Sequence, residues 1–184
     1  MMAPSDKELL DRLRRGDTRA SGLLFERYQP GLSAYCRHIL KDHDMAEDAT
    51  QEVFELLASR STVLDSVKEL RPWLFRVARN CSLMMLRSAR RTVPADEALE
   101  IWDGATPLEL AQENDVRSLV HAALGRMNAA YQEVIVLRVF EELTYAEIAE
   151  ILEEPLGTVK FRLFKARETL VRLLGPLDEE RRLS

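Results

Sequence analysis

The segment from residue 128 to 174 constrains the fold most strongly, because it contains three helical patterns and one short turn. Apolar residues recur at three- and four-residue intervals over Asn128–Phe140, which predicts an amphipathic helix capped by Asn128. Thr144-Tyr145-Ala146-Glu147 is a capping box that begins a short helix ending near Leu152. After Glu153-Glu154-Pro155, a third helix extends to about Leu174. Two helices joined by so short a turn predict a helix-turn-helix.

The third of these helices separates its side chains by face. The stripe expected to face the interior is Val159, Leu163, Ala166 and Leu170. The cations of this helix are Lys160, Arg162, Lys165, Arg167 and Arg172, and Glu168 is its only carboxylate. Because the whole chain has a net charge of -5, this local concentration of cations favours phosphate binding. An ordinary solvated amphipathic helix is the alternative interpretation.

The same segment carries a family resemblance. Tyr145–Leu152, followed by Pro155–Lys160 and Ala166-Arg167, resembles the promoter-reading helix-turn-helix at the C-terminal end of the extracytoplasmic function (ECF) sigma factors. Glu153 stands where that family usually has a turn glycine, so the turn is expected to be built differently here. Phe161 stands where a small serine is usual, so an altered base preference is expected.

A recognition helix reads bases with its N-terminal, outward residues. The resemblance therefore implies contacts to the minus-35 element from Leu156, Gly157, Thr158, Lys160, Phe161, Arg162, Lys165 and Arg167. Lys160 is the candidate for a guanine edge or a nearby phosphate, and Arg162 and Arg167 are candidate phosphate clamps. Phe161 can pack on a thymine methyl group or on the sugar backbone.

An acidic helix face occurs in the first half of the chain. Asp44-Met45-Ala46-Glu47 is expected to cap this helix, with Ala46, Ala49, Val53, Leu56 and Leu57 turned inward. The outward residues are Asp48, Gln51, Glu52 and Glu55. From the residues alone, this face is either a solvated surface or a docking site for a basic partner. Ala46–Phe54 resembles the sigma-factor segment that grips the clamp helices of RNA polymerase, which implies that these four residues bind polymerase.

A helix expected from Pro72 to about Arg91 carries arginines and no carboxylate, which indicates a polyanionic partner. It is expected to bury Trp73, Leu74, Val77, Cys81 and either Met84 or Met85. Trp73–Asn80 is similar to the family's helix that opens promoter DNA and holds the minus-ten strand. The implied minus-ten contacts are Lys68, Arg76, Arg79, Asn80, Arg87, Arg90 and Arg91. The segment Ser59–Leu70 is expected to be a loop that carries base choice, because the corresponding loop of relatives receives a flipped base.

The remaining patterns complete an all-α prediction. Ser5-Asp6-Lys7-Glu8 is a capping box, and a helix beginning near Asp17 keeps its spacing through Pro30-Gly31. Residues 92–105 are acidic and contain proline and glycine, which predicts a flexible linker, and a helix is expected from Thr106 to about Arg126. The expected organisation is two small helical domains, residues 1–91 and 106–184, joined by the linker 92–105.

Other classes of protein find little support in these 184 residues. No apolar run reaches the length of a membrane span and the N-terminus lacks a signal-peptide core, so a cytoplasmic protein without membrane insertion is expected. Cys36 and Cys81 lack metal-ligand spacing and are expected to be reduced thiols. His38 and His43-Asp44 raise the possibility of a metal-dependent phosphohydrolase, but no second His-Asp pair completes a ligand set.

The sequence therefore predicts a sigma factor with no catalytic residues, metal or cofactor. It would bind core RNA polymerase and promoter DNA, and the resemblance implies control by an anti-sigma factor. The alternative is a helix-turn-helix regulator whose first half dimerises or senses a signal. An enzyme is disfavoured because glycine-rich phosphate loops, nucleophile elbows and metal clusters are absent from the sequence.

Overall fold

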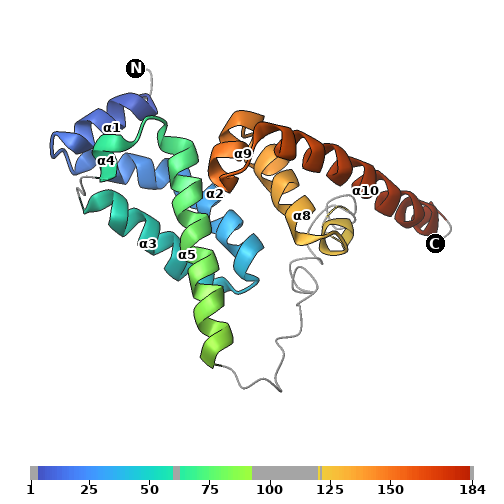
Figure 1. The fold of residues 1–184 in the computed structure, drawn as a ribbon. Coiled ribbons are helices and arrows are strands. Elements are labelled where there is room, and N and C mark those ends of the chain that lie inside the picture. The colour runs from blue at the N-terminus through green and yellow to red at the C-terminus, as the bar shows by residue number, and fades with distance from the viewer. Residues whose placement is uncertain (1–3, 60–62, 93–119, 121, 183–184) are drawn as a thin grey trace. The chain divides into compact units, whose positions relative to one another are not determined.

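A computed structural model of the chain describes residues 4–59, 63–92, 120 and 122–182, and every regular element in them is helical (Figure 1). The elements are α1 (Asp6–Arg14), α2 (Arg19–Leu40), α3 (His43–Ala58), α4 (Val63–Ser66), α5 (Leu70–Thr92), α8 (Ala129–Ile135), the π-helical turn η1 (Val136–Phe140), α9 (Tyr145–Leu152) and α10 (Leu156–Arg182). This confirms the all-α prediction.

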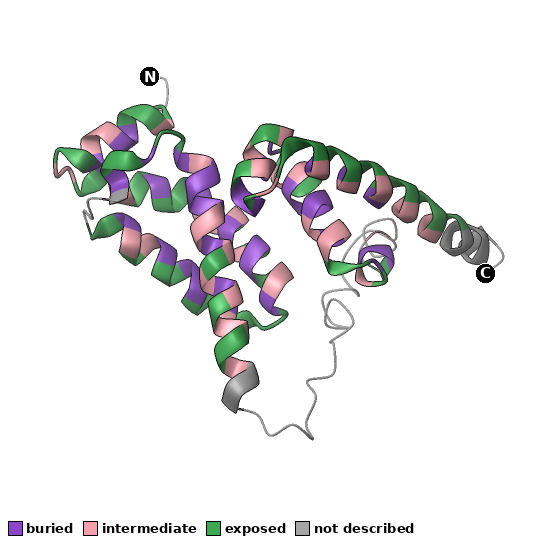
Figure 2. Cartoon of the chain, in the orientation of Figure 1, coloured by how far each residue is buried: buried purple, intermediate pink, exposed green. Residues whose placement is uncertain are grey.

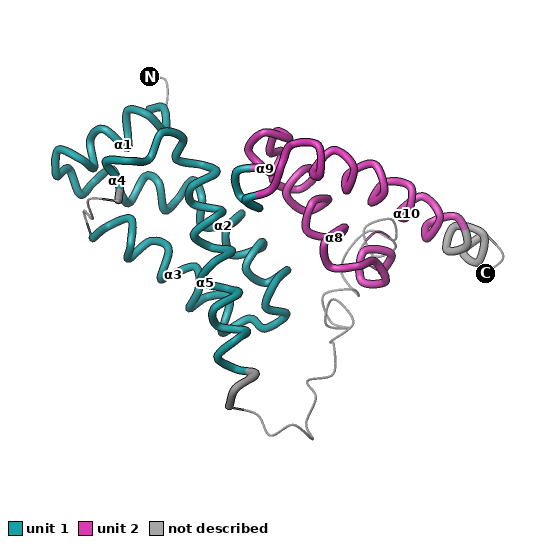
Figure 3. Tube along the Cα trace, in the orientation of Figure 1, with its two compact units in different colours: residues 1–97, 150–153 teal, residues 98–149, 154–184 magenta. Residues whose placement is uncertain are grey.

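The chain divides into two compact units (Figure 3). One comprises residues 1–97 with 150–153, and the other comprises residues 98–149 with 154–184. A two-part helical layout is therefore confirmed. Of the linker predicted at 92–105 only residue 92 is described, and of the helix predicted from Thr106 to about Arg126 only residues 120 and 122–126 are described, so those boundaries stay a prediction.

The first unit is built around α2, which packs against α1, α3 and α5, while α3 also packs against α5. The apolar stripes of these helices form the buried core (Figure 2). Its largest fully buried side chains include Tyr35 and Phe75, whose ring centroids lie 5.5 Å apart. As predicted, α2 continues through Pro30, which is exposed and removes one backbone donor from the helix.

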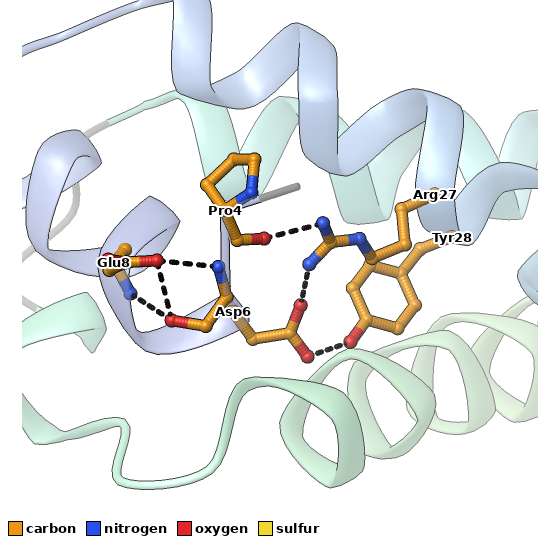
Figure 4. A network of polar contacts seen from close by, with 6 residues as sticks. Pro4, Asp6, Glu8, Arg27 and Tyr28 are labelled. Atoms are coloured by element: carbon orange, nitrogen blue, oxygen red, sulfur yellow. Dashed lines mark hydrogen bonds and ion pairs between the residues drawn. The ribbon is translucent and has the colours of Figure 1, made fainter. Parts of the chain in front are cut away.

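Polar contacts fasten α1 to α2 (Figure 4). The Asp6 carboxylate accepts hydrogen bonds from the Arg27 guanidinium and from the Tyr28 hydroxyl. Arg27 also donates to the Pro4 carbonyl at 2.7 Å. Burial and the neighbouring Asp6 raise the pKa of Tyr28, so this phenol stays protonated and remains a donor. The start of α1 is thereby held in place by charge-assisted bonds as well as by apolar packing.

Helix capping follows the sequence with one exception. The capping box at the start of α1, formed by Ser5 and Glu8, is confirmed by reciprocal bonds of 3.3 and 2.7 Å. The cap predicted at Asp44 is wrong. Asp42 accepts a hydrogen bond from the Met45 amide at 2.8 Å, and α3 begins at His43. Asp42 has the extended backbone that a cap requires, whereas Asp44 already lies inside the helix.

In the second unit, α8 packs against α10. The Asn128 cap is confirmed by its 2.9 Å bond to the Ala130 amide. The helix predicted to continue to Phe140 changes at Val136 into the π-helical turn η1, which ends the α-helical hydrogen-bonding pattern. The Thr144 capping box is also confirmed, because its amide donates to Glu147 at 2.7 Å and its hydroxyl accepts from the Glu147 amide at 3.2 Å.

Candidate nucleic-acid interfaces

The turn between α9 and α10 contradicts the expectation that glutamate would change its backbone. Glu153 adopts a left-handed conformation with φ of 56°. The Glu154 amide then donates back to the Ala149 carbonyl at 3.0 Å, which closes the end of α9. The turn is therefore formed with glutamate in the backbone conformation that favours glycine, at a conformational cost of about 1 kcal/mol.

An ion pair joins this turn to the first turns of α10. Glu154 and Arg162 lie 2.9 Å apart, and their side chains are only 25% and 26% exposed. Directly before α10, the Pro155 carbonyl accepts from the Thr158 amide at 2.9 Å. Arg162, which the sequence predicted as a phosphate clamp, is thus engaged by a carboxylate of its own chain.

The outward face of α10 combines cations with exposed apolar side chains. Val159, Leu163 and Ala166 are buried, as predicted, which fixes the rotational phase of the helix. On the opposite side, Lys160 is exposed and Phe161 is 58% exposed. Leu156 and Gly157 are also exposed, and Thr158 is half-buried.

Phe164 is a further candidate for a DNA contact and was not among those predicted from the sequence. It is 65% exposed and lies three residues after Phe161 on the same helix, so the two aromatic rings share a face. The i, i+3 spacing of two phenylalanines outside the apolar stripe was the available signal.

The remaining cations of α10 differ in their partners. Lys165 is half-buried and pairs with Glu168 at 2.9 Å, and this carboxylate raises the pKa of the lysine. Arg167 is exposed and donates to the Tyr145 hydroxyl at 3.4 Å, a long bond that leaves the guanidinium accessible. Lys160 and Arg167 are therefore the cations of the predicted set best placed to meet phosphate.

Along α5, the predicted minus-ten residues lie on the less buried side of the helix. Arg76 and Arg79 are half-buried, and Asn80 and Arg87 are exposed. The side chains of Arg90 and Arg91 lie outside the described residues. Met84 is 57% exposed and Met85 is half-buried, which resolves the open alternative in favour of Met85 as the more inward side chain.

The segment before α5 is more ordered than the predicted loop. It contains one helical turn, α4. Leu64, Val67 and Leu70 are buried, while Asp65 and Lys68 are exposed. Apolar residues at three-residue intervals anchor this segment, and the polar side chains between them face outward. The prediction of an unstructured loop over all of Ser59–Leu70 is therefore wrong for residues 63–66.

The acidic side chains of α3 share one exposed face. Asp48, Gln51, Glu52 and Glu55 are all exposed, whereas Ala49 and Val53 are fully buried. Gln51 donates to Glu55 at 2.7 Å. Leu56, which was expected to turn inward, is half-buried.

A partly exposed aromatic pair adjoins this face and was not predicted from the sequence. Phe54 of α3 lies 4.7 Å from Phe25 of α2 between ring centroids, and Phe25 is 47% exposed. Acidic and aromatic surface therefore meet on α3.

The residues weighed as metal ligands are not assembled into a site. Among the described residues, no group of three histidine, cysteine or carboxylate side chains could hold a metal ion. Cys36 is buried, Cys81 is half-buried, and both are free thiols whose pKa is raised by burial. Within the same part of the chain, no helix is both long and apolar enough to cross a membrane.

Comparisons with known proteins agree with both halves of this arrangement. Residues 24–92 match the family model "Sigma-70 region 2", and residues 117–170 match the model "Sigma-70, region 4". The chain is 28% identical to the RNA polymerase sigma-H factor of Pseudomonas aeruginosa, covering 95% of this chain and 96% of that protein. It is 27% identical to the ECF RNA polymerase sigma factor SigW of Bacillus subtilis, covering 93% and 97%.

Solved structures give the same result. The chain is similar to the sigma factor RpoE of Bartonella quintana, solved in complex with the anti-sigma factor NepR, with 25% identity, a TM-score of 0.69 and coverage of 83% of this chain and 95% of that one. It is also similar to CnrH in complex with the cytosolic domain of CnrY, with 27% identity, a TM-score of 0.66 and coverage of 92% and 96%. Since both sigma-70 regions are matched in order and the relatives align over nearly their whole length, the chain belongs to the ECF family of RNA polymerase sigma factors.

Proposed function

We propose that this protein binds core RNA polymerase and directs it to specific promoters, and that it has no catalytic chemistry of its own. The observation that carries the proposal is the presence, in one chain, of an exposed acidic helix face in the region 2 match and a capped helix-turn-helix in the region 4 match. A helix-turn-helix regulator whose first half dimerises or senses a signal needs only the second of these features, so the alternative gives no reason for the acidic face of α3.

Polymerase binding is assigned to α3. Asp48, Glu52 and Glu55 present negative charge, with the neutral Gln51 among them, beside the partly exposed aromatic pair Phe25–Phe54. A basic partner surface with an apolar centre would be complementary to this combination, because charge steers association and buried aromatic rings supply affinity.

Promoter binding is divided between two helices. α5 and the segment before it would hold the minus-ten DNA through Lys68, Arg76, Arg79, Asn80, Arg87, Arg90 and Arg91. The arginines would supply phosphate contacts, and the exposed side chains between Ser59 and Leu70 would carry base choice. α10 would enter the major groove at the minus-35 element with Leu156, Gly157, Thr158, Lys160 and Phe161 foremost, followed by Lys165 and Arg167. Arg162 would reach a phosphate only by releasing Glu154.

Control by an anti-sigma factor is part of the proposal. Two similar structures contain a bound second protein, which in the RpoE structure is the anti-sigma factor NepR. A partner of this kind would cover surface that polymerase also needs, so binding of the two should be mutually exclusive.

The decisive experiment is transcription by core RNA polymerase with and without the purified chain on a promoter library. We expect specific initiation only when the chain is present. Alanine at Asp48, Gln51 and Glu52 together should weaken binding to core enzyme while changing stability by about 0.5 kcal/mol or less, because exposed side chains contribute little to folding. Glu26→Ala, which removes an exposed carboxylate from α2, is the control. Unchanged core affinity in the triple variant would contradict the assignment of α3.

A further inference from the structure

Arg14, at the end of α1, binds the short segment that precedes α5. Its Nε and Nη2 atoms donate to the Leu64 carbonyl at 3.2 and 2.8 Å, and Nη2 also donates to the Val67 carbonyl at 2.7 Å. The same guanidinium is held from the other side by Asp11 at 3.1 Å. One side chain, about 50 residues away in sequence, thus joins α1 to two carbonyls, one within α4 and one directly after it.

These carbonyls belong to the backbone that presents the exposed side chains. Leu64 and Val67 are 2% and 6% exposed and anchor the segment, whereas Asp65 and Lys68 next to them are exposed. Because α4 is a single helical turn, its last carbonyls have few intrahelical partners. The Leu64 carbonyl accepts one backbone bond, from the Val67 amide at 3.2 Å. Arg14 therefore fixes the orientation of a segment that has little regular structure of its own.

We propose that Arg14 is a positioning residue for minus-ten recognition, which holds the segment from Leu64 to Glu69 so that its exposed side chains meet the DNA bases in one geometry. This inference rests on the proposed function, in which that segment reads the minus-ten strand. α1 precedes the residues matched by the region 2 model, so the contact lies outside the matched motif.

The chemistry of the contact favours arginine specifically. A guanidinium carries donors in a rigid planar fork and can serve two carbonyls at once, whereas a lysine ammonium is a flexible point charge. Positive charge also stabilises the carbonyl end of a helical turn. Arg12, on the same helix, is bound instead by Asp17 at 2.8 Å and so provides a matched arginine that serves a different partner.

The test uses holoenzyme reconstituted from core RNA polymerase and the full chain, on promoters randomised at the minus-ten element. Arg14→Ala should lose about three- to tenfold of its discrimination among minus-ten bases, as expected when a residue outside the contact perturbs a coupled site. Arg14→Lys should lose part of it, and Arg12→Ala should keep it. The ranking of minus-35 sequences and the affinity for core enzyme should be unchanged in all three variants, a pattern that general destabilisation would not produce.

Discrimination by folded Arg14→Ala equal to that of the unchanged protein would overturn the inference. If circular dichroism shows that Arg14→Ala does not fold, Arg14→Lys decides the question, and an unchanged ranking in that variant overturns it equally.

Asp65→Ala and Lys68→Ala separate this inference from the proposed function. If these variants alter the minus-ten ranking and Arg14→Ala does not, only the role of Arg14 is wrong. If neither alters the ranking, the segment does not read DNA, and both the inference and the assigned role of the segment are overturned.

Discussion

The two helices assigned to DNA, α5 and α10, differ in the carboxylates and apolar side chains that accompany their cations. Between Leu70 and Thr92, α5 contains no carboxylate, and its exposed residues include Asn80, Met84 and Arg87. On α10 and its turn, two cations pair with carboxylates of the chain, Arg162 with Glu154 and Lys165 with Glu168. The exposed side of α10 is instead enriched in phenylalanine. A helix whose own sequence contains cations and no carboxylate is suited to phosphate affinity, and one that combines cation–carboxylate pairs with exposed phenylalanines is suited to base discrimination.

The units that carry these helices also differ in their interiors. The first unit encloses titratable side chains, among them Cys36 and Tyr28, and half-buries His38. In the second unit, the buried side chains around α8 and α10 are aliphatic, and Gln132 is satisfied by its 2.8 Å bond to the Met127 carbonyl. A fall in pH should therefore destabilise the first unit more than the second.

The largest expected effect is on the salt dependence of promoter binding. Alanine at both Arg79 and Arg87 should lower affinity for minus-ten DNA by about ten- to a hundredfold at low salt. It should also reduce the slope of log affinity against log salt by about two, because each phosphate contact that is removed no longer releases counterions from the DNA. Arg37→Ala removes an exposed arginine from α2 and should leave the slope unchanged. Binding isotherms measured at several salt concentrations check this, and an unaltered slope in the double variant would remove the distinction between the two helices.

The next effect concerns pH. Burial, with Lys41 nearby, lowers the pKa of His38 from 6.5 to about 3. Between pH 6.5 and about pH 3, His38 binds a proton in the unfolded chain but not in the folded chain. The stability that depends on neutral His38 is therefore present above pH 6.5 and is lost as the pH falls. From pH 7 to pH 5 the first unit should lose about 1–2 kcal/mol of unfolding free energy. The carboxyl groups of Glu8 and Asp17 have lowered pKa values and titrate below this window.

Amide hydrogen exchange resolves this loss by helix. Exchange from α2, α3 and α5 should accelerate at pH 5 beyond the intrinsic pH effect, and exchange from α8 and α10 should not. In His38→Gln the difference between the two sets of helices should disappear. Equal acceleration in both units of the unchanged protein would refute the contrast between their interiors.

A smaller effect separates shape from charge on α10. Phe161→Ser should change the ranking of minus-35 sequences by about three- to tenfold, because the ring can pack on a thymine methyl group that serine cannot cover. Arg167→Ala should instead weaken all sequences alike and reduce the salt slope. Binding-site selection with each variant checks both statements. A ranking preserved in Phe161→Ser would mean that this ring does not face DNA.

The smallest expected effect tests the turn. Glu153→Gly should raise the unfolding free energy by about 0.5–1 kcal/mol, because glycine adopts the left-handed backbone without steric cost. The freedom that glycine adds to the unfolded chain acts in the opposite direction and is included in this net value. Glu153→Ala keeps the Cβ atom and should give no such gain. Chemical denaturation of the two variants provides the comparison, and equal stability would show that the backbone at Glu153 is not strained.

Much of this protein was predictable because its signals are local. The capping boxes at Ser5 and Thr144 and the asparagine cap at residue 128 each involve residues within one turn, and the structure confirms them. The apolar stripe of α10 is confirmed for Val159, Leu163 and Ala166, while Leu170 is half-buried. The exposed acidic face of α3 follows from the same helical periodicity. The sequence by itself therefore determined the helical class, most helix ends and the phase of the faces assigned to polymerase and DNA.

Only the tertiary structure decided features that depend on partners distant in sequence or on competition between neighbours. No pattern indicated that Arg14 would reach the carbonyls of Leu64 and Val67, because this pairing arises from the packing of α1 beside α4. The choice of Glu154 as the partner of Arg162 depends on how the turn directs the two helices. The left-handed backbone at Glu153 disagrees with the local preference of glutamate, and closure of the turn by the bond from the Glu154 amide to the Ala149 carbonyl outweighs that preference of about 1 kcal/mol.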